Sequence, residues 1–426
     1  MARRTPAIKS STTPIALPFE AGIDLNELLP KEVIHSLIQL PPKETLPQIT
    51  YQEFISLVSQ KSFLEKLRLS ILALIDFKLA FYSKLIESQR QLSKNTKAMV
   101  EALESKGVSK DEIERQCPGH ATFTSTIALA NTLVHDLCSR KSGLTLQTLS
   151  DSITQAFTDP KYGLASLKGR DDLKLWIATT INAFAKNYKI MGDVFKNISL
   201  MGPPGSGKTR MAGVISWVFY HFYIIENSTP NITTSADIIA GFVGQTGARV
   251  RGVFLESLGR LLFIDEAYQM GLNVYGEEGI TELVNLLDKY SAISWCVVAG
   301  YESEMMTKFM PKNKGLHRRF PHQFVLEPYS AHELTNIFIS GLVELLPNDT
   351  KVTENDHNLF FSVFQNALIK DPDLFEYQAG DVGELSQRVA MKVGDEWESL
   401  TLGQKITSLD ESLDSLAEKK KHREEY

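Results

Sequence analysis

One short run constrains the fold of this chain more than any other feature: Gly202-Pro203-Pro204-Gly205-Ser206-Gly207-Lys208-Thr209. It fits the pattern G-x-x-x-x-G-K-[ST] at every fixed position. Glycines let a backbone take positive φ and approach a phosphate without a Cβ in the way. Successive N–H groups then point into one concavity, and a helix that begins there directs its positive dipole end at the same anion. The run therefore predicts a phosphate-binding loop between a strand and a helix.

The residues on both sides of this loop fit the prediction. Residues 195–201 read as a short strand, and residues 211–223 are apolar and free of proline. A glycine-rich turn before a helix is the alternative, which this context disfavours. Lys208 supplies a point charge for the outer phosphates, and the Thr209 hydroxyl can ligate Mg²⁺. The predicted nucleotide-binding residues are Gly202, Pro203, Pro204, Gly205, Ser206, Gly207, Lys208, Thr209 and Arg210.

Two carboxylates follow an apolar run, Leu261-Leu262-Phe263-Ile264-Asp265-Glu266. A buried strand here delivers both to its C-terminal edge, where ligands of α/β sheets bind. Asp265 can hold the Mg²⁺ that bridges the terminal phosphates. Glu266 is placed to polarise an attacking water as a general base. A strand that ends in an acidic turn is the alternative, but downstream of a phosphate loop the pair predicts nucleotide hydrolysis.

Charge and cysteine content limit the compartment and the partners. The net charge of −6 gives the chain as a whole no bulk attraction for a polyanion. Its three cysteines, Cys117, Cys138 and Cys296, are too far apart for a metal knuckle and suggest reduced thiols in the cytoplasm. No stretch qualifies as a membrane span, because the most apolar candidate, 67–86, carries four charged residues. Residues 1–19 have the composition of an organelle transit peptide, but their prolines argue against an amphipathic targeting helix and favour a disordered tail. Organellar import stays open as the alternative to a cytoplasmic location.

The chain divides into five predicted segments: a disordered tail (1–22), a mostly α-helical N-terminal domain (23–158), an α/β core (159–327), a helical lid (328–405) and a charged tail (406–426). The N-terminal domain lacks Gly and Pro over residues 51–106, which predicts one long helix or two. A capping-box spacing at 109–112 predicts a restart, and 122–158 read as helical again. Strand-like runs are expected at 198–201, 222–225, 261–264 and 293–299, alternating with helices as in a parallel sheet.

Several segments together resemble a known family. They are Tyr162-Gly163-Leu164-Ala165-Ser166-Leu167-Lys168, Ile239-Ala240-Gly241-Phe242-Val243-Gly244-Gln245-Thr246, Phe263-Ile264-Asp265-Glu266-Ala267-Tyr268, Ala299-Gly300-Tyr301 and Gly315-Leu316-His317-Arg318-Arg319-Phe320. With the phosphate loop (Walker A) and the Asp-Glu strand (Walker B), they look like an AAA+ ATPase. Residues 159–400 are similar to the CbxX/CfqX group, which contains red-type Rubisco activases and sporulation protein K-like ATPases. Residues 1–158 are not covered by the resemblance.

The resemblance implies an AAA+ P-loop NTPase core, in which helices flank a parallel sheet, and a C-terminal helical lid. It also implies ATP and Mg²⁺ as ligands and a homo-oligomeric ring, for which hexamers are the family's habit. Phe242, Val243 and Gly244 look like a pore loop that grips a polypeptide, although without the family they read as a buried strand end. Arg319 aligns with the arginine finger that reaches a neighbouring subunit's ATP, and Arg318 can share that role. A pair of solvated arginines is the alternative.

Two positions depart from related patterns. AAA+ proteins at large often place a polar residue after the fourth strand, where this chain reads Val298-Ala299-Gly300-Tyr301, as the CbxX-like group often does. The family's lid pattern is Gly-Asn-Ala-Arg, and this chain reads Gly380-Asp381-Val382-Gly383. Gly383 therefore stands where a phosphate-sensing arginine is expected, and Arg388 is a candidate replacement.

Three functions follow. The first is a ring ATPase that remodels a protein substrate, with the N-terminal domain recruiting the target or an adaptor. The second is a nucleic-acid-associated ATPase, such as a loader or a viral replication or packaging factor, with Arg249 and Arg251 as phosphate contacts. Acidic net charge and the absence of a nucleic-acid module count against it. The third is an ATP-dependent scaffold with slow turnover, motivated by Gly383.

Overall fold

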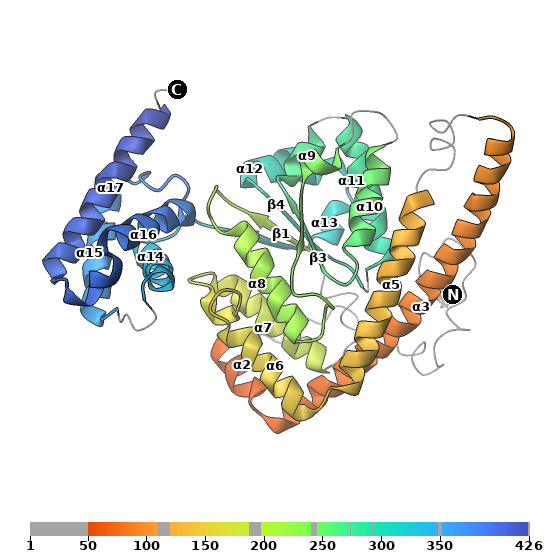
Figure 1. The fold of residues 1–426 in the computed structure, drawn as a ribbon, viewed down its shortest axis with the longest axis horizontal. Coiled ribbons are helices and arrows are strands. Elements are labelled where there is room, and N and C mark those ends of the chain that lie inside the picture. The colour runs from red at the N-terminus through yellow and green to blue at the C-terminus, as the bar shows by residue number, and fades with distance from the viewer. Residues whose placement is uncertain are drawn as a thin grey trace, which may run out of the picture.

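The structure is a computed structural model that describes residues 50–108, 120–186, 197–239, 245–272, 274–291, 293–347 and 352–424. At its centre lies a five-stranded sheet in the order β2-β3-β4-β1-β5 (Figure 1). The strands are β1 Ile198–Met201, β2 Asn231–Thr234, β3 Leu261–Asp265, β4 Trp295–Gly300 and β5 His322–Val325. Every neighbouring pair is parallel, with Ile198 opposite both Val297 and His322. This confirms the predicted α/β class.

The strand expected at 222–225 is wrong. These residues form turns after α8 (Lys208–His221), and the apolar side chains Phe222, Ile224 and Ile225 are buried there without pairing in the sheet. The second strand is instead β2, a polar segment at the edge of the sheet with Ile232 53% exposed. An edge strand needs no continuous apolar run. The apolar run at 222–225 therefore marks a buried turn, and the polar β2 carries no such run.

Helices surround the sheet in Figure 1. The longer ones are α7 Asp171–Lys186, α8, α10 Thr246–Glu256 and α11 Val274–Lys289. Short helices α9 Ser235–Ile238, α12 Glu302–Glu304 and α13 Leu316–Arg319 lie in the connections. Among the described residues, none of the helices has both the length and the apolar content to cross a membrane.

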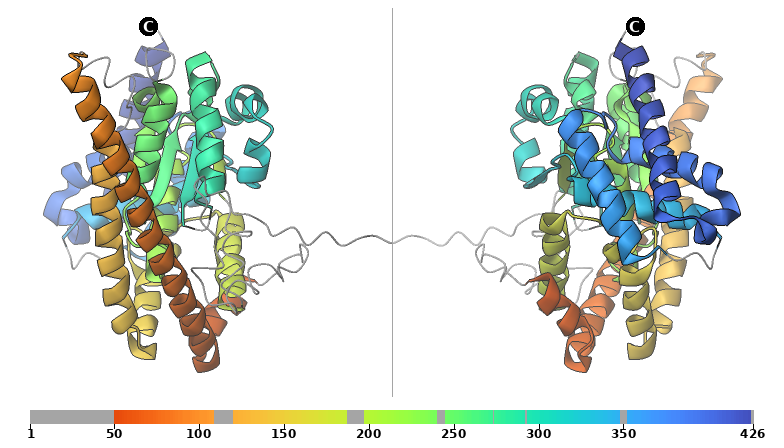
Figure 2. Two further views of the ribbon diagram at one scale, coloured as in Figure 1. Left: turned by 90° about the vertical axis from the view of Figure 1, so that its right-hand side faces the viewer. Right: turned by 90° about the vertical axis from the view of Figure 1, so that its left-hand side faces the viewer.

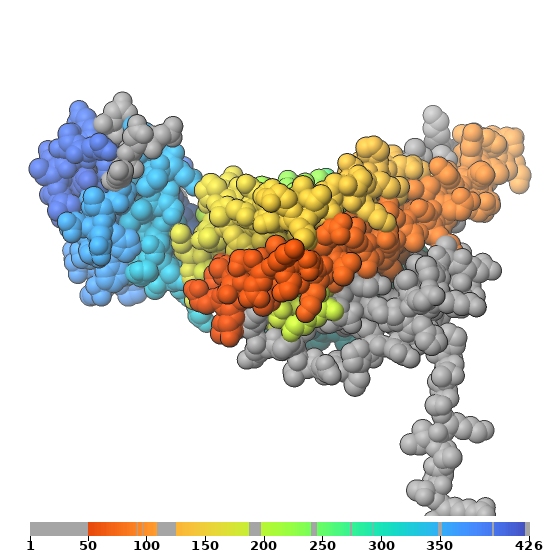
Figure 3. All heavy atoms as spheres, turned by 90° about the horizontal axis from the view of Figure 1, so that it is seen from below, coloured from red at the N-terminus to blue at the C-terminus, as the bar shows by residue number. Residues whose placement is uncertain are grey.

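The N-terminal residues form α2 Tyr51–Val58, α3 Lys61–Ser105, α5 His120–Ser142 and α6 Leu146–Thr158. The stretch 51–106 is thus two helices, and the predicted restart at 109–112 lies outside the described residues. Helices α3 and α5 lie side by side in both views of Figure 2, and Figure 3 shows the N-terminal helices covering one face of the core. Phe54 of α2 packs on Phe157 and Phe222, with ring centroids 5.9 and 6.3 Å apart. These helices and the sheet share one hydrophobic core, and the boundary at 158 stays a prediction.

A buried charge network joins the N-terminal helices to the turn after α8. Lys78 of α3 donates from Nζ to Glu226 Oε1 at 2.6 Å and to the Ile224 carbonyl, and both charged side chains are 1% exposed. Arg140 of α5 donates to the carbonyls of Ile225 and Tyr220 at 2.8 and 2.6 Å. Burial lowers the pKa of Lys78, and the Glu226 carboxylate opposes that shift. Two cations from two helices thus hold one turn of the core.

The lid comprises α14 Ala331–Leu345, α15 Glu354–Lys370, α16 Ala379–Val393 and α17 Leu402–Glu424, around a core of its own. Ser330 caps α14 in a capping box with Glu333. Helix α17 continues through most of the segment predicted as a charged tail, and its Leu409, Leu413 and Leu416 are buried in the lid core. The charged residues between these leucines made the segment read as a solvated tail, although the leucines recur at helical spacing.

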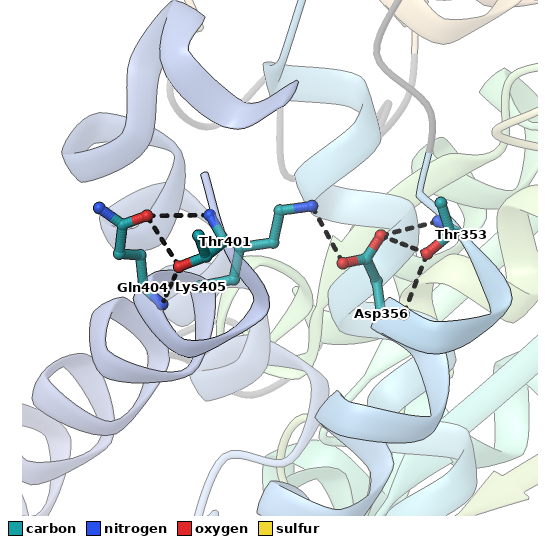
Figure 4. Close-up of polar contacts among 5 residues, drawn as sticks. All are labelled: Thr353, Asp356, Thr401, Gln404 and Lys405. Atoms are coloured by element: carbon teal, nitrogen blue, oxygen red, sulfur yellow. Dashed lines mark hydrogen bonds and ion pairs between the residues drawn. The ribbon is translucent and has the colours of Figure 1, made fainter. Parts of the chain in front are cut away.

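A buried ion pair attaches α17 to α15 (Figure 4). Lys405 Nζ lies 3.0 Å from Asp356 Oδ1, and the side chains are 9% and 1% exposed. Burial raises the pKa of Asp356, but hydrogen bonds from Thr353 and Lys405 together outweigh it and lower the pKa. The Lys405 amine also lies 4.2 Å from the centroid of the buried Trp397 ring. The pair sets the position of the last helix on the lid.

Candidate functional site

A cavity of about 540 Å³ lies where the carboxyl ends of β3 and β4, the start of α8 and the lid helices α14 and α16 meet. Eight predicted site residues line it, among them Lys208, Thr209, Asp265 and Glu266. The loop residues Pro204, Gly205 and Gly207 and the neighbouring Arg210 line it as well. The site therefore occupies the edge of the sheet where α/β folds bind ligands.

The loop from Gly202 to Gly207 has the backbone shape that a phosphate cradle requires. Gly205 and Gly207 take φ of 67° and 88°, a region that L side chains rarely adopt. Gly207 is the N-cap of α8, so the helix begins at the cavity. The Gly202 amide donates to the Gly300 carbonyl at 3.1 Å, which ties the loop to the end of β4. Gly202, Pro203 and Ser206 shape the loop without lining the cavity.

Lys208 lies at the first position of α8, with its amine folded over the loop. Nζ donates to the carbonyls of Gly202 and Pro203 at 2.9 and 2.8 Å. Burial lowers the pKa of Lys208, and the carboxylates of Asp265 and Glu266 oppose the shift. A cation is thus held between the loop and the two acids, which is where the outer phosphates of a nucleotide need one.

The two carboxylates occupy different backbone environments. Asp265 ends β3, and its Oδ1 accepts from the Glu266 amide at 2.9 Å. Glu266 takes φ 50°, ψ 38°, a left-handed conformation that is uncommon for a residue other than glycine and clusters at functional sites. Ser235 Oγ donates to the Glu266 carbonyl at 3.0 Å, and the Gln269 amide donates to Glu266 Oε2. Ser235 and Gln269 thus orient Glu266, and no sequence motif singled them out.

The residues fit a Mg²⁺ ion that is held together with a nucleotide. Thr209 and Asp265 bring a hydroxyl and a carboxylate into one cavity, and hard oxygen donors are what Mg²⁺ prefers. Within the described ranges, no group of three or more His, Cys, Asp or Glu side chains could hold a metal by itself. A Mg²⁺ site completed by phosphates and water needs only one or two protein ligands.

Aromatic and lid residues form the remaining walls. Tyr268 and Tyr301 pack together, with ring centroids 5.8 Å apart, and both line the cavity. Ile337, Gly341 and Glu344 of α14 close the lid side. Sequence reasoning did not select these lid residues, because their helical spacing is the same as that of ordinary core positions.

No arginine of α16, the helix that carries Gly383, lines the cavity. Gly383 lines the cavity, and a Cβ built there would meet nothing within 4 Å. Arg388 does not line it. Its guanidinium donates to Glu384 Oε1, at 2.7 Å, and to Ser415 of α17, so the structure gives no support to Arg388 as the replacement.

The predicted finger residues Arg318 and Arg319 do not line this cavity. Arg319 ends α13, its Nη2 lies 2.6 Å from Asp288 Oδ1, and its side chain is 18% exposed. Arg318 is exposed beside it. Phe242, Val243 and Gly244 lie outside the described residues, between α9 and α10. Of the arginines considered for nucleic acid, Arg251 is paired with Glu282 at 2.7 Å, and Arg249 donates to the Ile239 carbonyl at 3.3 Å.

Comparison with known proteins agrees with the geometry. Residues 198–326 match the family described as "ATPase family associated with various cellular activities (AAA)". The chain is 29% identical over 184 residues to Stage V sporulation protein K of Bacillus subtilis, covering 41% of this chain and 56% of that protein. It is 30% identical over 152 residues to the Protein CfxQ homolog of Galdieria sulphuraria, covering 35% of this chain and 50% of that protein. It is also 28% identical over 192 residues to the ESX-1 secretion system protein EccA1 of Mycobacterium tuberculosis, covering 43% of this chain and 33% of that protein.

These matches confirm an AAA ATPase domain at residues 198–326 and its likeness to the CbxX/CfqX group. The chain spans about half the length of the first of these relatives and a third of the secretion protein. The domain match ends at the start of the lid and leaves the N-terminal helices outside it.

Proposed function

We propose that the AAA ATPase domain of this chain hydrolyses ATP between the subunits of a ring and uses the energy to remodel a protein substrate. One observation carries the proposal. A single cavity gathers a lysine, a hydroxyl and two carboxylates at the start of α8 and the end of β3, beneath a helical lid. Phosphoryl transfer asks a protein chiefly for positioning and for stabilisation of charge, and this set provides both.

Each residue has a defined task in this proposal. The loop amides and Lys208 bind the phosphates, and Thr209 and Asp265 hold Mg²⁺. The ion, when bound, neutralises charge that develops on the phosphate oxygens. Glu266, which Ser235 and Gln269 orient, takes a proton from the attacking water. Tyr268 and Tyr301 close the wall beside Lys208, whose amine lies 5.7 Å from the Tyr301 ring centroid.

Arg319 is the proposed finger that completes a neighbour's site. Its guanidinium is permanently charged and offers a rigid donor fork for a γ-phosphate. When subunits assemble, the Arg319 guanidinium would leave the Asp288 carboxylate and bind the γ-phosphate in the neighbouring subunit. The ion pair with Asp288 would hold Arg319 before assembly, and an isolated subunit would then hydrolyse ATP slowly.

Mixing two inactive variants tests the ring and the finger together. Lys208→Ala and Arg319→Ala are each expected to lose ATPase activity by about 10³-fold. In a randomly mixed ring, about a quarter of the sites regain an intact loop and an intact neighbouring finger, so activity should return to about a quarter of the parent's. ATP hydrolysis measured across mixing ratios checks this, with Arg318→Ala in place of Arg319→Ala as the matched control. A mixture that stays inactive at every ratio contradicts a finger supplied in trans.

The pore loop is tested separately from hydrolysis. Phe242→Ala is expected to keep ATPase activity within about threefold of the parent, because the aromatic serves grip and not chemistry. The same variant should lose ATP-dependent binding of a fluorescent, permanently unfolded polypeptide, measured by anisotropy in the presence of ATP. Phe361→Ala, on the lid helix α15, is the control for loss of an aromatic ring. Unchanged polypeptide binding by Phe242→Ala would remove the loop from the proposal.

The N-terminal helices are the proposed recruitment element. They are packed into the core of the ATPase domain, so a target bound there is held at a set position relative to the ring. Slow turnover remains the second candidate, because Gly383 puts no lid arginine in the cavity.

A further inference from the structure

The carbonyl of Ser206, within the phosphate loop, accepts two side-chain hydrogen bonds. The Tyr329 hydroxyl donates to it at 3.0 Å, and Arg170 Nη2 donates at 3.2 Å. A trans peptide is planar, with its C=O and N–H pointing in opposite directions. Two donors on the Ser206 carbonyl therefore aim the next amide, that of Gly207, to the opposite side. Because Gly207 lines the cavity, the two side chains set the orientation of a phosphate-binding amide.

Arg170 links this peptide to the start of the lid. Its Nη1 donates to the Glu327 carbonyl at 2.9 Å, just after β5, and its guanidinium lies 4.2 Å from the Tyr329 ring centroid. Arg170 holds these contacts with φ at 57°, which is uncommon for a residue with a Cβ. One side chain thus contacts the loop, the linker before α14 and the tyrosine on that linker.

The lid contacts the same assembly from the other side. The Tyr329 amide donates to Gln378 Oε1 at 2.9 Å, and the Ala379 amide donates to the Gly205 carbonyl at 3.2 Å. Gln378 is also left-handed, with φ at 45°. The Tyr377 carbonyl oxygen is so near that a Cβ on Gly205 would meet it at 1.8 Å. The start of α16 is therefore in direct contact with the phosphate loop.

We propose that Arg170 and Tyr329 are positioning residues that couple phosphate occupancy of the loop to the position of the lid. They take over the coupling role of the lid arginine that is expected at position 383, where this chain has glycine. The proposal rests on ATP binding as set out under the proposed function. Anion binding fixes the Gly207 amide. The planar peptide passes that constraint to the Ser206 carbonyl, and Tyr329 and Gln378 pass it to α16. Hydrogen bonds in such a chain polarise and reinforce one another.

Hydrogen exchange of the full chain in a Glu266→Gln background tests the coupling, because that change is designed to keep ATP bound. In this background, ATP with Mg²⁺ is expected to slow amide exchange in 326–330 and in the first turns of α16. Tyr329→Phe removes one hydroxyl, and Arg170→Asn removes the guanidinium while keeping a residue that tolerates left-handed φ. Each should weaken ATP binding by only about fivefold and abolish the ATP-dependent protection of α16. Tyr162→Phe, whose ring packs on Trp217 with centroids 6.2 Å apart, is the matched control.

The outcomes separate this coupling from the proposed function. Loss of protection in both variants at saturating ATP, with unchanged melting curves and a normal control, supports the coupling. Full protection in Tyr329→Phe overturns it, as does an equal loss in Tyr162→Phe. An ATP-bound parent whose lid exchange does not change overturns it too, and leaves ATP hydrolysis intact. Failure of Glu266→Gln to bind ATP at all overturns the proposed function itself, and this inference with it.

Discussion

Glu266→Gln is expected to lower ATP hydrolysis by about 10²- to 10⁴-fold, the contribution typical of a positioned general base. The amide is isosteric with the carboxylate but cannot take a proton from water. Glu266 also lies directly after β3 in a conformation that Ser235 and Gln269 hold, so the replacement should leave the backbone in place. Steady-state phosphate release measures the loss, and fluorescent-nucleotide titration should show ATP affinity within about threefold of the parent.

The matched control for this prediction is Glu256→Gln, an exposed glutamate at the end of α10 that does not line the cavity. It should hydrolyse ATP at the parent rate. A parent that already turns over as slowly as Glu266→Gln would contradict the remodelling proposal and favour the scaffold, in which ATP acts as a bound ligand. The comparison decides between the two because only a cycling enzyme depends on its base.

The site was predictable from sequence to the extent that its parts are local. Residues 202–209 carry the loop's conformation in their own glycines, and Asp265 and Glu266 follow a strand whose C-terminal edge is where ligands bind. Gln269 and Ser235 were not predicted, because no motif specifies their contacts with Glu266: Gln269 lies in the 3₁₀ turn after Glu266, and Ser235 is the first residue of α9.

Non-local contacts explain what the sequence did not predict. Arg170 reaches Glu327 across 157 residues of sequence, and Tyr329 reaches Ser206 across 123. No spacing rule connects residues so far apart. The same limit applies to β2, whose polar residues become a strand only because β3 offers an edge. It also applies to α17, whose leucines become core only against α15 and α16.

Lys78→Met is expected to destabilise the protein by about 3–5 kcal/mol, the usual cost of removing one partner from a buried ion pair. Glu226 would lose its hydrogen-bonded partner, Nζ of Lys78 at 2.6 Å, in a buried site, and the charge of Arg140 would compensate it only in part. The Ile224 carbonyl would lose a donor as well. Urea unfolding followed by circular dichroism and by tryptophan fluorescence measures the change, and agreement between the two probes tests whether a single transition is being read.

The double variant Lys78→Met/Glu226→Leu separates the cost of the unpaired charge from that of the lost contact. Removing both charges should recover most of the stability, because apolar replacements of a buried pair are often neutral or better. Lys61→Met is the control: its partner Glu65 lies 3.9 Å away with both side chains more than half exposed, so the change should stay within about 0.5 kcal/mol. A double variant as unstable as the single one would contradict this account and shift the weight to the Ile224 carbonyl. If stability recovers but α3 changes its position, the pair sets where the N-terminal helices pack on the core. A recruitment element on a ring requires such a fixed position.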